Sequence, residues 1–170
     1  ITTTLPYVNA EPHIGHAYQK IVGDVLSRWN KLLGRDVFFL TGTDEHGKKV
    51  ETEAKLANKD PKEFVNEISP KFIDSWKRLN INYDRFIRTT DLDHQEFVKK
   101  FILKCYDNKD IYKGFYSGFY CVGCENYVTE KDLVDGKCPI HPNKKIEKIE
   151  EESYFFKLSK YRDFLLNLYE

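Results

Sequence analysis

The chain begins ITTTLPYVNAEPHIGH over residues Ile1–His16. The β-branched run Ile1–Thr4 is typical of a strand, and the proline that follows it ends the strand. From His13 onward, apolar residues recur with the period of a helix until Gly34 provides a stop. These apolar residues are Ile14, Ala17, Ile21, Val22, Val25, Leu26, Trp29, Leu32 and Leu33. The sequence therefore predicts a strand, a tight loop that carries Tyr7 and Asn9, and an amphipathic helix whose first turn presents two histidines.

The first turn of this helix has the properties of an anion-binding site. Backbone N–H groups at a helix N-terminus lack partners within the helix, and the helix dipole favours negative charge there. Gly15 has no Cβ and would let a ligand approach the backbone. His13 and His16 are three residues apart, so both rings can lie on one side of the turn and donate to a polyphosphate. Two ordinary surface histidines near a helix start are the alternative interpretation.

A second buried strand is expected at Asp36–Thr41, which reads DVFFLT. Strand, helix and strand form one βαβ unit, the opening of a doubly wound fold that binds ligands at the carboxyl ends of its strands. The loops Leu5–His16 and Thr41–Gly47 both emerge there. In the second loop, the carboxylate of Asp44 or Glu45 could hold a substrate ammonium group. Alternatively, Asp44 or Glu45 could cap the helix that is expected to begin near Gly47.

Two further helices are expected in the first two thirds of the chain. Asp60 is an N-cap followed by a proline at the first helical position. Pro70 should kink or split this helix. Its apolar stripe consists of Phe64, Ile68, Phe72, Trp76 and Leu79, and the aromatic residues of this stripe should form core. After a short strand at Arg85–Arg88, Thr90 is expected to cap the second helix, in which Cys105 should be a buried thiol.

From Ile111 the chain is rich in glycine and aromatic residues, which predicts short strands in a separate small module. This stretch leads into Cys121-Val122-Gly123-Cys124, and after thirteen intervening residues the chain reads Cys138-Pro139-Ile140-His141. Two such knuckles can surround one tetrahedral zinc ion. Three thiolates and one imidazole fill all four positions, so the site should be structural, and this spacing favours a metal over a disulfide.

The end of the chain is expected to contain a solvated strand or linker at Lys144–Glu152, a strand at Ser153–Phe156 and an amphipathic helix at Leu158–Leu168. The 170 residues are 41% hydrophobic, enough for one sizeable core, or for one core and a small module. The 27 basic and 27 acidic residues balance, so no global basic field marks a nucleic-acid binder, although a local patch stays open. The absence of an apolar leader, of a membrane-length run and of any methionine suggests a fragment of a cytoplasmic protein.

The segment His13–His16 is similar to the HIGH signature of the class I aminoacyl-tRNA synthetases. The flanking motifs LPYVN at Leu5–Asn9 and TGTDEHG at Thr41–Gly47 narrow the resemblance to the methionyl-tRNA synthetase family, and it extends over essentially the whole chain. It implies an α/β fold: the first half of a Rossmann-like (class I synthetase, HUP-type) parallel sheet with an inserted small zinc-binding module. Residues 1–110 would be the first half of the catalytic domain. Residues 111–170 would be the connective-peptide insertion, with its zinc knuckle at 121–141.

The resemblance also implies a function and a set of site residues. The family activates L-methionine with ATP, accompanied by Mg²⁺, and transfers the methionyl group to tRNA(Met). Glu45 and His46 would support the site or its ATP end. The implied roles are catalysis by His13 and His16; ATP binding by Asn9, His13, Gly15 and His16; methionine binding by Leu5, Tyr7 and Asp44; and structural zinc binding by Cys121, Cys124, Cys138 and His141. The tetrapeptide Lys157–Lys160 resembles the second family signature, KMSKS, but it follows the knuckle too directly to be that loop.

The resemblance places the second half of the fold beyond Glu170, so the chain alone should have little activity. Two other classes of protein stay open. A sister class I enzyme, such as the cysteine one, uses zinc to contact its substrate, but it needs an open coordination position that the four ligands here do not leave. A zinc-ribbon module that binds RNA or protein is the non-enzymatic alternative. The balanced charge and the HIGH motif argue against it.

Overall fold

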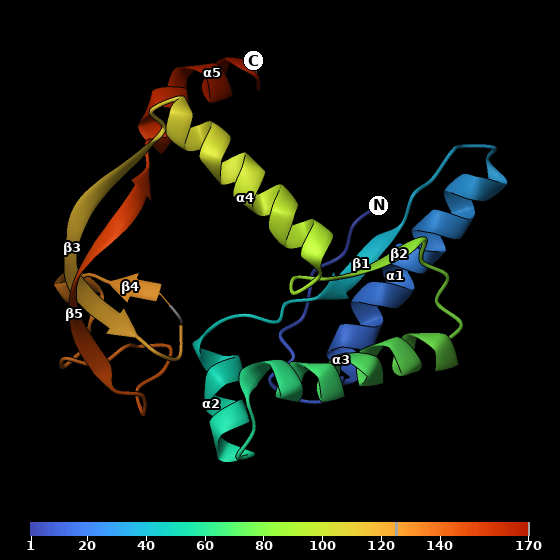
Figure 1. The fold of residues 1–170 in the computed structure, drawn as a ribbon, viewed down its shortest axis with the longest axis horizontal. Helices are drawn as coiled ribbons and strands as arrows, with labels where there is room; N and C mark the ends of the chain where they lie inside the picture. The colour runs from blue at the N-terminus through green and yellow to red at the C-terminus, as the bar shows by residue number, and fades with distance from the viewer. Residues whose placement is uncertain (125, 170) are drawn as a thin grey trace. The chain divides into compact units, whose positions relative to one another are not determined.

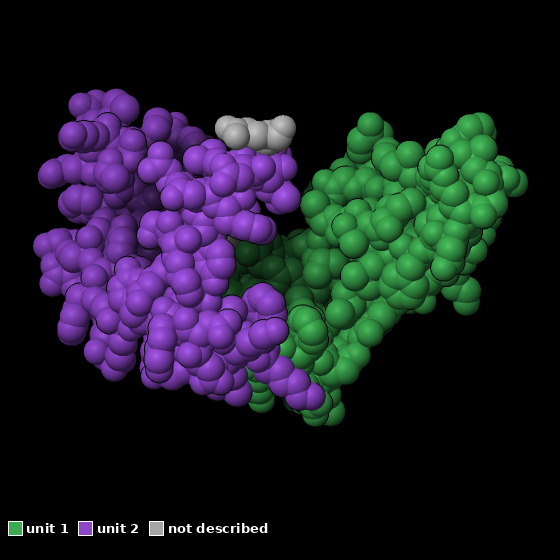
Figure 2. Space-filling view, turned by 90° about the horizontal axis from the view of Figure 1, so that it is seen from above, with its two compact units in different colours: residues 1–99 green, residues 100–170 purple. Residues whose placement is uncertain are grey.

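The computed structural model describes residues 1–124 and 126–169 (Figure 1). The chain divides into two compact units, Ile1–Lys99 and Lys100–Glu170, which Figure 2 distinguishes by colour. The division falls within helix α4 (Leu92–Asp107). The domain boundary expected between residues 110 and 111 stays a prediction. Among the helices of the described residues, none is long and apolar enough to cross a membrane.

A parallel sheet lies at the centre of the first unit. Strand β1 (Leu40–Thr43) pairs in parallel with the predicted strand β2 (Arg85–Arg88). The N-terminal segment also runs parallel to β1, with isolated bridges from Thr2 to Leu40 and from Tyr7 to Asp44. Because the carboxyl ends of parallel strands meet at one edge of a sheet, the loops that follow these three segments begin at the same edge.

Both predicted strands of the βαβ unit are shorter than expected. Ile1–Thr4 forms one bridge rather than a strand, because the Thr4 carbonyl accepts a hydrogen bond from the ammonium group of Lys20 instead of continuing the ladder. Strand β1 begins at Leu40 rather than Asp36, because Asp84 holds the preceding backbone. The Phe39 N–H donates to the Asp84 carboxylate at 2.7 Å, and the Phe39 carbonyl accepts from the Asp84 N–H at 2.9 Å.

Helix α1 (Ile14–Leu32) is the predicted helix, but it buries its polar side. Large apolar residues of the predicted stripe are exposed: Ile14, Ile21, Val22, Val25, Leu26, Trp29, Leu32 and Leu33. Gly23 explains this orientation, because a Cβ there would lie 2.8 Å from Thr3 Cγ2 and 2.9 Å from the Phe39 ring. The helix can approach the sheet this closely only with its small residue inward. The buried Asp24 is satisfied by Arg28 Nε at 2.7 Å.

Helices α2 (Lys48–Leu56) and α3 (Pro61–Arg78) complete the first unit. The N-cap of α2 is Gly47, so neither Asp44 nor Glu45 caps it. Asp60 caps α3 as predicted, accepting the Lys62 N–H at 2.8 Å. Helix α3 continues through Pro70 as one helix, so the predicted split does not occur. The core consists of Val8, Phe39, Val50, Ala54, Phe64, Val65, Phe72, Trp76 and Ile81, which confirms three of the predicted core aromatics.

The second unit is built on a long antiparallel hairpin (Figure 1). Strands β3 (Ile111–Cys121) and β5 (Ile146–Phe156) pair along their whole length. Strand β4 (Asn126–Val128) pairs with the other edge of β3. The predicted short strands and the predicted linker are therefore parts of two long strands. Charged residues pair across this hairpin, as Lys113 Nζ does with Glu152 at 2.5 Å, so its polar pattern is compatible with a ladder.

The helix predicted at the end of the chain is divided into a 3-10 turn η2 (Leu158–Tyr161) and α5 (Arg162–Asn167); a further turn, η1 (Glu130–Asp132), precedes the second knuckle. In η2, Lys160 Nζ and the Tyr161 hydroxyl bind the buried Asp110 carboxylate at 2.5 and 2.6 Å. These contacts account for the separate turn. Thr90 does not cap α4 but donates its hydroxyl to Glu45. Cys105 is half-buried rather than buried.

Candidate active site and metal centre

Two histidine rings close the first turn of α1. His13 is the N-cap, and its Nδ1 accepts a hydrogen bond from the Gly15 N–H at 3.1 Å. His16 Nδ1 accepts from the His13 N–H at 3.4 Å, which completes a reciprocal capping box. The rings stack with centroids 3.7 Å apart. Because each Nδ1 accepts, the proton of each neutral ring lies on Nε2, which is the nitrogen left to donate to a ligand.

The surroundings of His16 favour its neutral form. Burial lowers the pKa of His16, and the positive charges of His13 and Lys20 lower it further. The Phe72 ring, 5.6 Å away between centroids, supports the imidazole from the core. The first turn therefore presents two ordered N–H donors where the helix dipole favours negative charge.

Gly15 fits the first turn for a reason that the sequence did not indicate. A Cβ at this position would lie 2.9 Å from Cε1 and 3.1 Å from Nδ1 of His13. The glycine is therefore required by the capping ring, and its own N–H is already bonded to that ring. Its role in ATP binding stays a prediction.

The second loop lies directly against the first. The Asp44 N–H donates to the Pro6 carbonyl at 2.9 Å, and the Asp44 carbonyl accepts from the Val8 N–H at 3.2 Å. These bonds place Asp44 beside Tyr7, as the parallel bridge between them shows. Leu5 and Asn9, on the same segment, are half-buried, whereas Tyr7 is 39% exposed. The structure thus brings the predicted methionine-binding residues Leu5, Tyr7 and Asp44 to one edge of the sheet.

A buried polar cluster around Glu45 adds residues that the sequence analysis missed. Its carboxylate accepts from Arg88 Nε at 2.7 Å and from Thr43 Oγ1 at 2.8 Å, and the Thr90 hydroxyl binds the other oxygen. Burial alone would raise the pKa of Glu45, but the donors around it hold the pKa below its ordinary value. An arginine at the end of the neighbouring strand was the available signal, because a buried carboxylate needs a charged partner.

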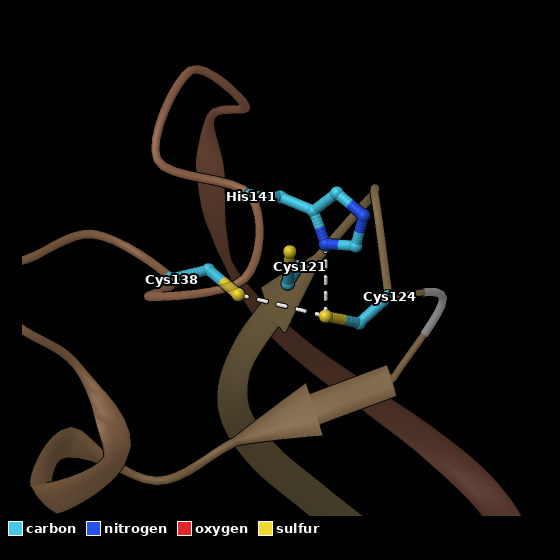
Figure 3. Close-up of side chains that lie close together, drawn as sticks. All are labelled: Cys121, Cys124, Cys138 and His141. Carbon is cyan, nitrogen blue, oxygen red and sulfur yellow. Dashed lines mark hydrogen bonds between the residues drawn. The ribbon is translucent and has the colours of Figure 1, made fainter.

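All four predicted metal ligands come together in the second unit (Figure 3). Their ligand atoms lie within 4.8 Å of one another. Cys124 Sγ is 3.5 Å from Cys138 Sγ and 3.1 Å from His141 Nδ1. Cys121 ends strand β3, and Cys124 follows in the turn toward β4. Two turns therefore contribute two ligands each, as the spacing predicts.

The chemistry of this donor set suits a divalent cation. Burial opposes ionisation of Cys138, but N–H groups of His141 and Ile140 and the other thiols lower its pKa to about 6. The hydrogen bond to Cys138, followed by burial, raises the pKa of Cys124 to about 12. One thiolate thus forms readily, and the next needs a positive charge at the centre.

Gly123 makes room for the imidazole ligand. A Cβ at this position would lie 2.5 Å from Cγ of His141 and 2.9 Å from its Cβ. Any larger residue would displace the ring from the cluster. The glycine inside the first knuckle therefore allows the His141 ring to reach the other three ligands.

Comparison with known proteins agrees with this geometry. The family model described as "tRNA synthetases class I (M)" matches residues 1–149. The chain belongs to the class I tRNA synthetases (M). Within that family it is similar to the methionine–tRNA ligase of Thermotoga maritima, with 51% identity over 100% of this chain and 28% of the relative. The methionine–tRNA ligase of a Nostoc species is 48% identical over 100% of this chain and 32% of its own length.

A solved structure of the family has the same fold. The Mycobacterium tuberculosis methionyl-tRNA synthetase in complex with methionyl-adenylate superposes with a TM-score of 0.90 at 43% identity, covering 99% of this chain and 34% of that one. The predicted resemblance to methionyl-tRNA synthetases and the predicted α/β fold with a parallel sheet are confirmed. The chain spans 28% to 34% of the lengths of these three relatives.

Proposed function

We propose that this chain is the part of a methionine–tRNA ligase that holds the phosphates of ATP and the amino group of methionine. The enzyme would form methionyl-adenylate and transfer its methionyl group to tRNA(Met), in the cytoplasm. The observation that carries the proposal is the 51% identity with a methionine–tRNA ligase across the entire chain. The hydrogen bonds between Asp44 and the first loop, which leads into the histidine turn, support it.

In the proposed activation step, the methionine carboxylate attacks the α-phosphorus of ATP, and pyrophosphate leaves. Negative charge on the phosphate oxygens grows in the transition state. His13 and His16 would stabilise it through their Nε2–H donors, already ordered by the capping box. Asn9 and Gly15 would line the same phosphate site. Mg²⁺ bound to the ATP phosphates would neutralise part of their charge.

The methionine site would combine one charge with an apolar pocket. Asp44 would accept hydrogen bonds from the α-ammonium group, which fixes the carboxylate of the same amino acid toward ATP. Leu5 and Tyr7 would contact the side chain, because a thioether makes only weak polar contacts. The backbone bonds between Asp44 and the first loop hold these three residues together.

The metal of the second unit would be zinc, held by Cys121, Cys124, Cys138 and His141. Four protein ligands leave no position for substrate, so the ion would stabilise the fold of the knuckle and take no part in the chemistry. This filled set also separates the proposal from a class I enzyme that uses zinc to read its amino acid.

Methionine-dependent exchange of pyrophosphate into ATP tests the proposal, measured on this chain and on the full-length protein that contains it. The full-length protein should exchange with methionine alone, and the chain alone should show little exchange. His16→Ala should lower kcat by about 10²–10³-fold, the usual cost of one transition-state donor. His94→Ala, which removes a histidine of α4, is the matched control and should leave exchange unchanged. Exchange with another amino acid, or none from a folded zinc-containing protein, would contradict the assignment.

A further inference from the structure

We propose that Glu45 is a positioning residue for amino-acid binding: it fixes the backbone at Asp44 so that the neighbouring carboxylate meets the substrate ammonium group. This inference rests on the proposed role of Asp44. The buried cluster around Glu45 thereby becomes part of the amino-acid site. The hydrogen-bond partners of Glu45 are Thr43, Arg88, Thr89 and Thr90, so the cluster acts on the Asp44 loop and not on the histidine turn.

The cluster is built around a carboxylate without solvent contact. The Glu45 side chain is 0% exposed, and its ion-pair partner Arg88 is 24% exposed. Each carboxylate oxygen has a donor: Oε1 accepts from Arg88 Nε at 2.7 Å and from Thr43 Oγ1 at 2.8 Å, and Oε2 accepts from Thr90. A buried charge with directional donors on both oxygens is confined to one orientation.

These bonds connect the Asp44 loop to the neighbouring strand. The Glu45 N–H donates to Thr89 Oγ1 at 2.9 Å, and the Thr89 N–H donates to the Thr43 carbonyl at 3.2 Å. The loops that follow β1 and β2 are therefore joined by backbone as well as by side chains.

The cluster also reaches helix α3. Thr43 Oγ1 lies 3.0 Å from Ser69 Oγ, and Arg88 Nη2 donates to Asn66 Oδ1 at 2.8 Å. Ser69 and Thr43 are both fully buried. The cluster is thus anchored on two strands and on a helix of the core, which are the rigid elements that a precise site requires.

Asp44 lies between this cluster and the first loop. On one side its backbone N–H and carbonyl are bonded to Pro6 and Val8, at 2.9 and 3.2 Å. On the other side its neighbour Glu45 is held by the cluster. Release of one anchor would let Asp44 move, and a displacement of about 1 Å at a substrate-binding group can cost about 10²-fold in rate. The effect should concern the ligand that Asp44 binds.

The test is exchange kinetics on the full-length protein with Glu45→Gln, which keeps the shape and removes the charge. The KM for methionine should rise at least about tenfold, whereas the KM for ATP should change less than about twofold. Thr90→Val is the second variant, because it removes one hydrogen bond and leaves no charge unpaired. It should raise the KM for methionine about two- to fivefold. Glu67→Gln, in an exposed ion pair with Lys59, is the matched control and should change neither constant.

A purely structural cluster would behave differently. In that case Glu45→Gln would lower thermal stability and affect both KM values alike, or affect neither, and the inference would be overturned. If Glu45→Gln does not fold, the methionine-selective effect of Thr90→Val decides the question. If the unmodified full-length protein shows no methionine-dependent exchange, the proposed function fails and this inference fails with it. Exchange by the unmodified protein without a methionine-selective change in the variants overturns the inference alone.

Discussion

Each imidazole in the first turn of α1 uses one nitrogen to cap the helix, and this assigns the proton to the other nitrogen. The same two side chains of the HxxH pattern therefore cap the helix with Nδ1 and present Nε2–H as a donor to a ligand. Gly15 belongs to the same arrangement, because the capping ring of His13 occupies the space of a Cβ. A motif first interpreted as a ligand site is equally a helix-capping motif.

Lys20 is a second residue whose position has a physical consequence. It lies one turn after His16, is fully buried, and donates to the Thr4 carbonyl. Burial lowers its pKa from 10.5 to about 8. The unfolded chain thus binds this proton more tightly than the folded chain does. Below about pH 8 the folded state carries the full penalty of a buried charge, and the penalty disappears as the pH rises toward 10.5.

Lys20→Met should remove this pH dependence. Between about pH 7.5 and about pH 10, the Tm of the unmodified protein should rise by about 10 °C relative to that of the variant. The reason is that a pKa lowered from 10.5 to about 8 raises the free energy of unfolding by about 2 kcal/mol over this range. Thermal unfolding followed by tryptophan fluorescence measures it. Lys55→Met, at an exposed lysine of α2, should give the slope of the unmodified protein. Parallel slopes for Lys20→Met and the unmodified protein would show that Lys20 titrates normally.

At the scale of elements, the sequence predicted where a helix begins better than which of its faces is buried. The capping signal Asp60-Pro61 placed the start of α3 correctly, because a cap depends only on its neighbours along the chain. The apolar stripe of α1 located the helix but not its buried face. Gly23 decides that face through its distance to Thr3 and Phe39, and such a contact between distant segments has no periodic signature.

The strands show the same division. The loop motifs at Leu5–Asn9 and Thr41–Gly47 were recognisable because their chemistry lies in consecutive residues. The length of the β3–β5 hairpin was not predicted, because its charged residues look like a linker until their partners across the ladder are known. The cluster around Glu45 was missed for the same reason, since its members come from β1, β2 and α3.

Asp60→Ala should destabilise the first unit by about 1 kcal/mol, because it removes the acceptor for the Lys62 N–H at the start of α3. Urea unfolding followed by the fluorescence of Trp29 and Trp76 measures the change, since both tryptophans lie in this unit. Asp60→Asn retains a capping oxygen and should lose only a few tenths of a kcal/mol. Equal losses from both substitutions would mean that the charge, rather than the cap, stabilises the helix.

At the scale of the whole molecule, the chain consists of two units with different sources of stability. The first unit has a core of nine buried apolar residues around its sheet. Helix α4, which extends into the second unit, buries no residue. The fully buried apolar side chains of the second unit include the ligands Cys121 and Cys138. We therefore expect a module with so little apolar core to depend for its folding on a metal held by this cluster.

Removal of the metal should therefore unfold the knuckle and leave the first unit folded. A strong chelator should abolish amide hydrogen-exchange protection in β3 and β5, while protection in α1 and α3 and the fluorescence of both tryptophans stay unchanged. The reason is that the ligand cluster closes the hairpin end at Cys121, whereas the apolar core lies in the first unit.

Gly123→Ala should reproduce this effect without a chelator, because its Cβ would occupy the space of the His141 ring. The zinc content measured after purification should fall from about one ion per chain to well below half. Cys105→Ser, which replaces the one cysteine outside the cluster, should retain the ion and the protection of the hairpin. Simultaneous unfolding of both units on chelation would contradict the independence of the first unit. Full protection of β3 and β5 without zinc would show that aromatic and cross-strand contacts, rather than the metal, stabilise the hairpin.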